Sequence, residues 1–249
     1  MSESVVIRPL EKPLRGSIRV PGDKSISHRA VLLSAMAEGT SQIRGVLDSD
    51  DVRSSIRVVQ QLGAQVNLQI MPDGSLEGAI TGWGAKGPSQ PDAPLDCGNS
   101  GTTARLLMGI LAPWGIEAEL TGDESLARRP MQRVMTPLSR MGARFSPQDA
   151  QPITERGTGR LDPITYESPV ASAQLKTAVL LAGLSADGET RVIEPAPSRN
   201  HTELMLPAFG ALLFWYTQSD PGNRLARKHL NNLFTLTQDT IPQDPQVAA

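Results

Sequence analysis

Residues 20–37 read VPGDKSISHRAVLLSAMA and combine a Pro-Gly turn, a short polar stretch and the apolar run of a predicted helix, Ser25–Ala37. Two cations, Lys24 and Arg29, stand where the chain reverses and the helix begins. Backbone N–H groups and the helix dipole at such an end favour an anion. The stretch suits a phosphorylated, carboxylate-rich small molecule, although a solvated turn with an N-capping serine explains it better if it is taken alone.

Two further helix starts share this design, and their recurrence favours a shared anion site. They read NSGTTARLLMGIL at 99–111 and SPVASAQLKTAVLLAGLSA at 168–186. Their first turns offer Asn99, Ser100, Gly101, Thr102 and Thr103 in one case, and Ser172, Ala173, Gln174 and Lys176 in the other. The second predicted helix of each unit follows further charges, at Asp50 and Asp51, at Arg128 and Arg129, and at Arg199. We expect several helix N-termini and at least three cations to face one site.

An internal repeat predicts the fold class. The segments LGAQV, MGARF and FGALL close three units and place Gly63, Gly142 and Gly210 at equivalent positions. A long-period repeat of this kind indicates one supersecondary unit used several times. The predicted helices are rich in Ala, Leu and Met, which favours burial on all sides. The chain is therefore expected to be α/β (α+β), with three βαβαββ-like units about a pseudo-threefold axis, buried helices inside and sheets outside.

The repeat also suggests where the domain begins and ends. Residues 1–20 read as a strand pair, 21–213 as the repeated domain, and 214–249 as a divergent tail without the repeat signature, expected to be partly disordered. In the third unit, Asn200 with Glu203 three residues later is typical of a capping box.

Composition limits the function classes. The 249 residues carry a net charge of −2 with no basic block, which argues against a nucleic-acid partner. No apolar run is long enough to span a membrane. The single cysteine, Cys97, excludes an internal disulfide and a multi-thiolate zinc site, and no metal site is expected. Because the N-terminus lacks a signal pattern, we expect a cytoplasmic protein.

Two short motifs match known signatures but lack the neighbouring sequence that those signatures require. Gly82, Gly84 and Gly87 satisfy G-x-G-x-x-G but run into PSQPDAP rather than a helix, so no helix N-terminus is there to hold a pyrophosphate. His201-Thr-Glu203 resembles the start of a zinc deaminase signature, but its P-C-x-x-C partner is missing. Cys97 and His28 are interpreted as structural residues.

Five motifs taken together resemble the N-terminal half of the EPSP synthase family. They are PGDKSISHRA, GNSGTTAR, RRPM, ASAQLK and SRNHTE, in family order over roughly residues 8–213, and they are most similar to the class II enzymes. The resemblance implies transfer of the enolpyruvyl group of phosphoenolpyruvate to shikimate 3-phosphate, on the route to chorismate and the aromatic amino acids, without a cofactor.

The resemblance also implies roles for individual residues. The shikimate 3-phosphate candidates are Lys24, Ser25, Arg29, Ser172, Ala173, Gln174 and Arg199. The phosphoenolpyruvate candidates are Lys24, Asn99, Gly101, Thr102, Arg129 and Gln174. Lys24, which would touch both substrates, is the implied catalytic residue.

Some features separate this sequence from the family pattern. Members have two such domains with the active site in the cleft between them, and this sequence matches only the first. We therefore expect turnover to require a C-terminal half or a homodimeric cleft, and a non-catalytic shikimate 3-phosphate-binding half is the alternative. The related UDP-N-acetylglucosamine enolpyruvyl transferases are less similar, because Lys24 is followed by Ser25 rather than Asn and the GDESLARRPM loop lacks their cysteine. Gly101 leaves the pocket as open as in glyphosate-sensitive enzymes.

Overall fold

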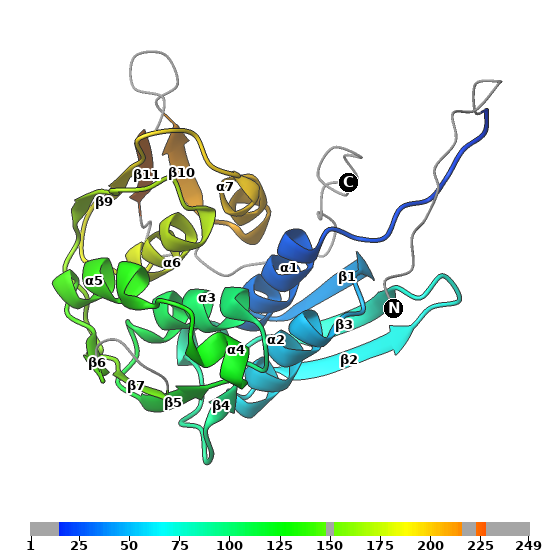
Figure 1. Cartoon of the computed structure of the whole chain (residues 1–249), viewed down its shortest axis with the longest axis horizontal. Coiled ribbons are helices and arrows are strands. Elements are labelled where there is room, and N and C mark those ends of the chain that lie inside the picture. Colours follow the sequence, from blue (N-terminus) through cyan, green and yellow to red (C-terminus); the bar gives the residue numbers. More distant parts are fainter. Residues whose placement is uncertain (1–14, 148–151, 216–222, 228–249) are drawn as a thin grey trace, which may run out of the picture.

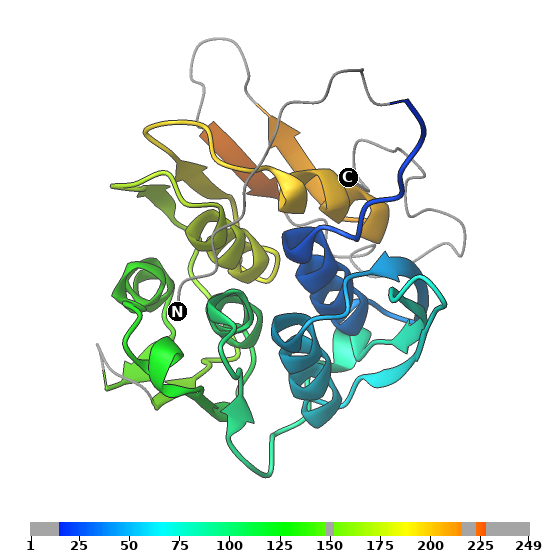
Figure 2. The same ribbon diagram turned by 45° about the vertical axis from the view of Figure 1, so that its right-hand side comes forward.

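Three sheets surround a bundle of helices in the computed structural model, which describes residues 15–147, 152–215 and 223–227 (Figure 1). The view in Figure 2 shows the helices in the middle and the sheets at the periphery. The predicted arrangement of buried helices inside and sheets outside is confirmed. In the described part of the chain, no helix has the length and apolarity that a membrane crossing requires.

The first unit runs from residue 24 to residue 81. It contains α1 (Lys24–Met36), β1 (Thr40–Val46), α2 (Asp50–Gln61), β2 (Gln65–Ile70) and β3 (Leu76–Thr81). The last strand, β3, lies between β1 and β2 and is antiparallel to both. A short 3₁₀ helix, η1 (Gly84–Lys86), then leads to the second unit.

The second and third units repeat this order and add a leading strand. The second contains β4 (Leu95–Asp96), α3 (Gly101–Leu111), β5 (Glu117–Thr121), α4 (Glu124–Ala127), α5 (Gln132–Arg140), β6 (Arg144–Ser146) and β7 (Ile153–Arg156). The third contains β8 (Thr165–Glu167), α6 (Ala173–Gly183), β9 (Thr190–Ile193), α7 (His201–Met205), η2 (Leu206–Phe209), β10 (Leu212–Trp215) and β11 (Asn223–Arg227). Again the last strand, β7 or β11, lies between the two before it, and the leading strand pairs in parallel.

The ends of the repeat differ from the prediction. The repeat does not stop at residue 213, because β10 and β11 extend the third sheet, with β11 paired to both β10 and β9. The predicted strand pair at 1–20 lies largely outside the described residues, and residues 15–20 form no strand. Most of the predicted tail, 228–249 included, also lies outside them.

The repeated glycines have a conformational reason. Gly63, Gly142 and Gly210 all have positive φ, at 98°, 117° and 77°, just after the last helical element of each unit. Glycine adopts this backbone conformation at little cost, whereas other residues are strained there. The glycines therefore end the helix and turn the chain into the following strand in all three units.

The central helices pack closely because their crossings use small residues. α6 buries every residue from Leu175 to Gly183, and α3 contacts both α5 and α6. At the crossing of α3 and α6, a Cβ atom on Gly109 would lie 2.2 Å from the carbonyl oxygen of Ala178. The absent side chain allows the two helix backbones to touch.

His28 is a structural residue of this core. It is fully buried on α1, and its Nδ1 lies 2.8 Å from Ser55 Oγ on α2. Burial lowers the pKa of His28 to about 4, and the charge of Asp51 offsets only part of this effect. The folded protein therefore keeps this imidazole neutral at pH values where an exposed histidine is protonated.

This burial predicts a loss of stability in acid. Between its ordinary pKa of 6.5 and the lowered pKa of about 4, the unfolded chain binds a proton at His28 that the folded chain does not. Stability contributed by this residue is therefore present above pH 6.5 and decreases as the pH falls, by about 3 kcal/mol in total. Urea unfolding of the parent and of His28→Asn, from pH 7.5 to 4.5, measures the difference. A parallel pH dependence in the two proteins would contradict the prediction; the comparison is needed because the buried Glu155, whose pKa is raised by desolvation, contributes an opposite slope.

Candidate functional site

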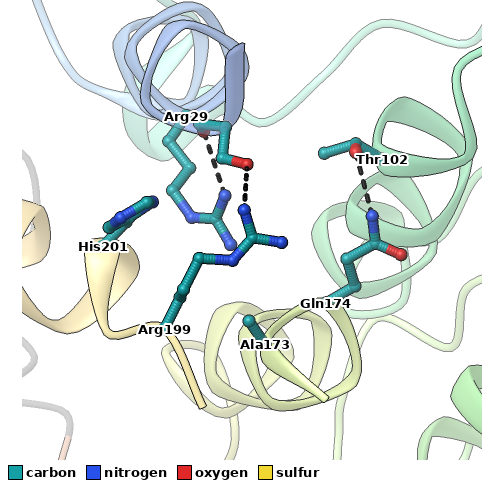
Figure 3. A pocket seen from close by; sticks show the side chains of 7 residues that line it. Arg29, Thr102, Ala173, Gln174, Arg199 and His201 are labelled. Carbon is teal, nitrogen blue, oxygen red and sulfur yellow. Dashed lines mark hydrogen bonds between the residues drawn. The ribbon is translucent and has the colours of Figure 1, made fainter. Parts of the chain in front are cut away.

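The first helices of the three units begin around one small pocket. α1 contributes Ser25 and Arg29, α3 contributes Thr102, and α6 contributes Ala173 and Gln174, while Arg199 and His201 reach it from the start of α7 (Figure 3). Each first helix is capped by a side chain that accepts from a backbone N–H, namely Asp23, Ser100 and Ser172. The structure thus brings together the helix starts that the repeat suggested.

Two arginines give the pocket its charge. Arg29 is only 3% exposed, and it donates from Nε to Thr202 Oγ1 (2.6 Å) and from Nη2 to Thr177 Oγ1 (2.9 Å). Burial lowers the pKa of Arg29 to about 10, so the guanidinium remains charged at neutral pH. Arg199 is exposed and donates to Ser25 Oγ over 3.2 Å.

The pocket leaves Arg199 available for an anion. No carboxylate within the described ranges forms an ion pair with it. Two guanidinium groups that face one space form charge-assisted hydrogen bonds with a phosphate or carboxylate, which are stronger than bonds between neutral groups. A phosphate at this point would replace the Ser25 hydroxyl as the acceptor for Arg199.

A chain of hydrogen bonds fixes the amide of Gln174. Arg105 donates from Nη1 to Gln174 Oε1 over 2.9 Å, and Gln174 donates from Nε2 to Thr102 Oγ1 over 2.9 Å. Arg105 is held in turn by the carbonyl oxygen of Pro130 at 3.1 Å. Since Thr102 Oγ1 accepts in this chain, its own hydroxyl hydrogen remains able to donate to a ligand.

Replacing Arg105 by methionine is expected to weaken binding of a pocket ligand about tenfold. The Gln174 amide would lose the donor that orients it, although methionine retains most of the buried volume. Titration calorimetry of Arg105→Met against the parent measures the effect, with Arg133→Met as a control for loss of a nearby positive charge. Equal affinities in the parent and Arg105→Met would exclude the orienting role.

The structure adds His201, whose role in this pocket the sequence did not show. Its Nδ1 lies 4.0 Å from Asp23 Oδ1, and its ring faces the same space as Arg29 (Figure 3). Burial lowers the pKa of His201, and the nearby Arg29 lowers it further. The zinc reading of His201-Thr-Glu203 was rejected on sequence grounds, and no cluster able to hold a metal ion occurs among the residues described.

Lys24 and Ser172 adjoin the pocket without lining it. Lys24 Nζ forms an ion pair of 2.8 Å with Asp51 Oδ2 at the start of α2, and its side chain is 54% exposed. Ser172 Oγ accepts from Leu175 N over 3.4 Å as the N-cap of α6. A ligand that Lys24 contacts must therefore compete with Asp51 for its ammonium group.

The remaining candidates form a second polar group beside the pocket. Arg129 donates from Nη2 to Asn99 Oδ1 (2.5 Å), and Asn99 donates from Nδ2 to Asp123 Oδ2 (2.7 Å). Gly101 is adjacent, and a Cβ there would lie 2.7 Å from Arg105 Nη1 and 3.3 Å from Arg129 Nη1. The missing side chain therefore leaves room for both arginines.

Two expectations about the third unit are wrong. Lys176 does not join the cations at the pocket, because it is fully buried between Glu194 and Glu203, each 2.8 Å away. Asn200 makes no side-chain cap, so Glu203 is not part of a capping box. Lys176 lies one turn into a helix whose other residues from Leu175 onwards carry no charge, which was the signal that it needs a buried partner.

The chain is similar in sequence to proteins of one known family. Residues 10–221 match the family described as EPSP synthase (3-phosphoshikimate 1-carboxyvinyltransferase). The chain is 46% identical over 248 residues to a 3-phosphoshikimate 1-carboxyvinyltransferase of Nitrobacter winogradskyi, covering 97% of this chain and 55% of the relative. It is 52% identical over 200 residues to one of Parvibaculum lavamentivorans, covering 80% and 44%.

The fold of the chain is also similar to solved structures of this family. The EPSP synthase of Acinetobacter baumannii superposes with a TM-score of 0.79 at 38% sequence identity, over 90% of this chain and 49% of that one. The chain spans about half the length of the curated relatives and solved structures that it matches.

Proposed function

The chain belongs to the EPSP synthase family, and from this premise we propose that it carries the shikimate 3-phosphate half of an enolpyruvyl transferase active site. The reaction moves the enolpyruvyl group of phosphoenolpyruvate to shikimate 3-phosphate and releases phosphate. One observation supports the assignment above the others: Arg29 and Arg199 converge with the first turns of α1, α3 and α6 on one pocket. The proposal includes a cytoplasmic location.

We assign the pocket residues to shikimate 3-phosphate by their chemistry. Arg199 would bind the phosphate, and Ser25, Arg29, Ser172 and Ala173 would complete that side of the ligand. Hydroxyl, backbone N–H and guanidinium donors are the groups that a phosphorylated polyol requires. The Gln174 amide, held by Arg105 and Thr102, would lie between the two substrates.

We assign Asn99, Gly101, Thr102 and Arg129 to the phosphoenolpyruvate side. The CH2 carbon of phosphoenolpyruvate gains a proton, and a hydroxyl of shikimate 3-phosphate loses its proton as its oxygen bonds to the adjacent carbon. The tetrahedral intermediate then loses phosphate together with a proton from the new methyl group, which restores the C=C double bond. Negative charge on two substrates held side by side must be balanced throughout. Lys24, next to Ser25, would supply that balance as the catalytic residue after it exchanges Asp51 for substrate.

A complementary half would complete the site. The relatives extend over about twice the matched length, and the proposal assigns closure of the pocket to a C-terminal half or to a second copy of the chain. A binding half that is inactive alone is the second candidate function, and it is favoured by Lys24, which pairs with Asp51 and does not line the pocket.

Two measurements test these assignments. Calorimetry should show saturable binding of shikimate 3-phosphate, much weaker binding of shikimate and no binding of UDP-N-acetylglucosamine. The absence of saturable binding at millimolar shikimate 3-phosphate would refute the assignment. Phosphate release from phosphoenolpyruvate, assayed with the chain alone and with an added C-terminal half of a relative, distinguishes a complete enzyme from a binding half.

A further inference from the structure

Four charged residues form a buried network behind the pocket. Lys176 Nζ lies 2.8 Å from Glu194 Oε2 and 2.8 Å from Glu203 Oε1, and all three side chains are at most 1% exposed. Glu194 Oε1 also accepts from the backbone N–H of Ser172 over 3.1 Å. Glu203 lies in the first turn of α7, two residues after His201. Lys176 thus ties the start of α6 to the start of α7.

The network continues to Arg29, one of the two arginines of the pocket. Thr177, which follows Lys176, lies 2.6 Å from Thr202, which precedes Glu203, measured between their Oγ1 atoms. Both threonines accept hydrogen bonds from the Arg29 guanidinium. Arg29 and Lys176 carry two positive charges and Glu194 and Glu203 two negative ones, so the enclosed group is neutral as a whole.

The cost of this arrangement indicates a purpose other than stability. Burying ions costs several kcal/mol each, and well-packed apolar residues often replace a buried ion pair without loss of stability. A buried polar network whose members are all hydrogen-bonded instead fixes the relative positions of the helices and strands that it joins. Here those elements are the ones from which Ala173, Gln174, Arg199 and His201 reach the pocket.

We propose that Lys176 is a positioning residue for the anion pocket: by binding Glu194 and Glu203 together, it fixes the first turns of α6 and α7 in the arrangement that receives the ligand. The proposal rests on the proposed function in so far as shikimate 3-phosphate is that ligand. Lys176 itself is fully buried and lies outside the pocket lining, so it acts through the residues it holds.

The charge balance makes the role testable by pH. In Lys176→Met, two carboxylates share an enclosed space with Arg29, and like charges there cannot both remain ionised at low cost. Protonation of one of them at low pH removes the repulsion. The other charged groups near the network are Asp23, Arg199 and His201, which remain in the variants, and a second variant that also removes one carboxylate charge controls for their titration.

The experiment compares shikimate 3-phosphate affinity by calorimetry in the parent, Lys176→Met and Lys176→Met/Glu194→Gln, from pH 5.5 to 8. Lys176→Met should bind at least tenfold more weakly than the parent at pH 8 and approach it at pH 5.5. In the double variant, the glutamine can still accept from Ser172, the charges balance again, and the ratio to the parent should not depend on pH. If Lys176→Met does not fold at pH 8, the double variant carries the comparison.

The outcomes separate this inference from the proposed function. If the parent binds and the affinity ratio of Lys176→Met is independent of pH, the positioning role is wrong. If the parent does not bind, the proposed function is wrong, and hydrogen exchange of the Ser172 amide in the ligand-free proteins decides on Lys176. Faster exchange in Lys176→Met than in the double variant at pH 8 supports the positioning role, and equal rates overturn it.

Discussion

Replacing Arg199 by alanine is expected to weaken shikimate 3-phosphate binding roughly 30- to 100-fold, with almost no change in stability. The guanidinium is exposed, its hydrogen bond joins only Ser25, and no carboxylate in the described part of the chain pairs with it. A charge-assisted hydrogen bond contributes about 1.5–3 kcal/mol, or roughly 10- to 150-fold in affinity, and a bidentate contact lies in the upper part of that range. An exposed side chain of this kind changes the free energy of unfolding by about 0.5 kcal/mol or less.

A control ligand without the phosphate and a control variant at another exposed arginine show whether the effect is specific to the contact between Arg199 and the phosphate. Shikimate, which lacks the phosphate, should bind the parent and Arg199→Ala with similar low affinity. Arg44→Ala removes one exposed charge from β1, outside the pocket lining, and should leave both affinities unchanged. If Arg199→Ala and Arg44→Ala bind shikimate 3-phosphate equally well, the phosphate does not lie against Arg199.

Replacing Gly109 by valine is expected to cost about 3 kcal/mol of stability at neutral pH. The first side-chain atom would lie 2.2 Å from Ala178 O and 2.7 Å from Ala178 Cα, and both are backbone atoms. Neither can rotate away, so α3 and α6 must separate, and overpacking of this kind costs about 1–3 kcal/mol or more. Urea unfolding followed by circular dichroism measures the change.

A graded series tests the cause. Gly109→Ala should be destabilised less than Gly109→Val, because only one atom enters the crossing. Gly115→Ala is the matched control, since a Cβ there meets no atom within 4 Å and the backbone has no positive φ. If Gly109→Ala is as stable as Gly115→Ala, the helices are not in backbone contact at Gly109.

The sequence predicted the repeat because its physical causes are local. A glycine with positive φ after a helix, a hydroxyl or carboxylate cap before one, and a uniformly apolar helix are each visible within a few residues. The predicted helix Ser25–Ala37 corresponds to α1, Lys24–Met36. The repeat also grouped Ser25, Arg29, Gln174 and Arg199, because the equivalent helix starts of repeated units are expected to face one common site.

The missed features depend on contacts between distant segments. Lys176 sits at the start of an otherwise uncharged helix, and only the fold reveals Glu194 and Glu203 beside it. His201, the first residue of α7, reaches the pocket because α7 contacts α1, an arrangement that no short motif records. The sequence does not predict β10 and β11, because residues after 213 lack the pattern of the earlier units. The pairing of these two strands nevertheless repeats the earlier strand order.

The strand order has a consequence for how the chain assembles during synthesis. In every unit the last strand to emerge occupies the place between the two strands before it, so β1 and β2, or β9 and β10, lack the strand that joins them until it arrives. Exposed strand edges invite pairing with other chains. The first sheet can close once residue 81 has left the ribosome, whereas the third must wait for residue 227. Nascent chains that end between residues 215 and 223 therefore leave β9 and β10 without the strand that joins them.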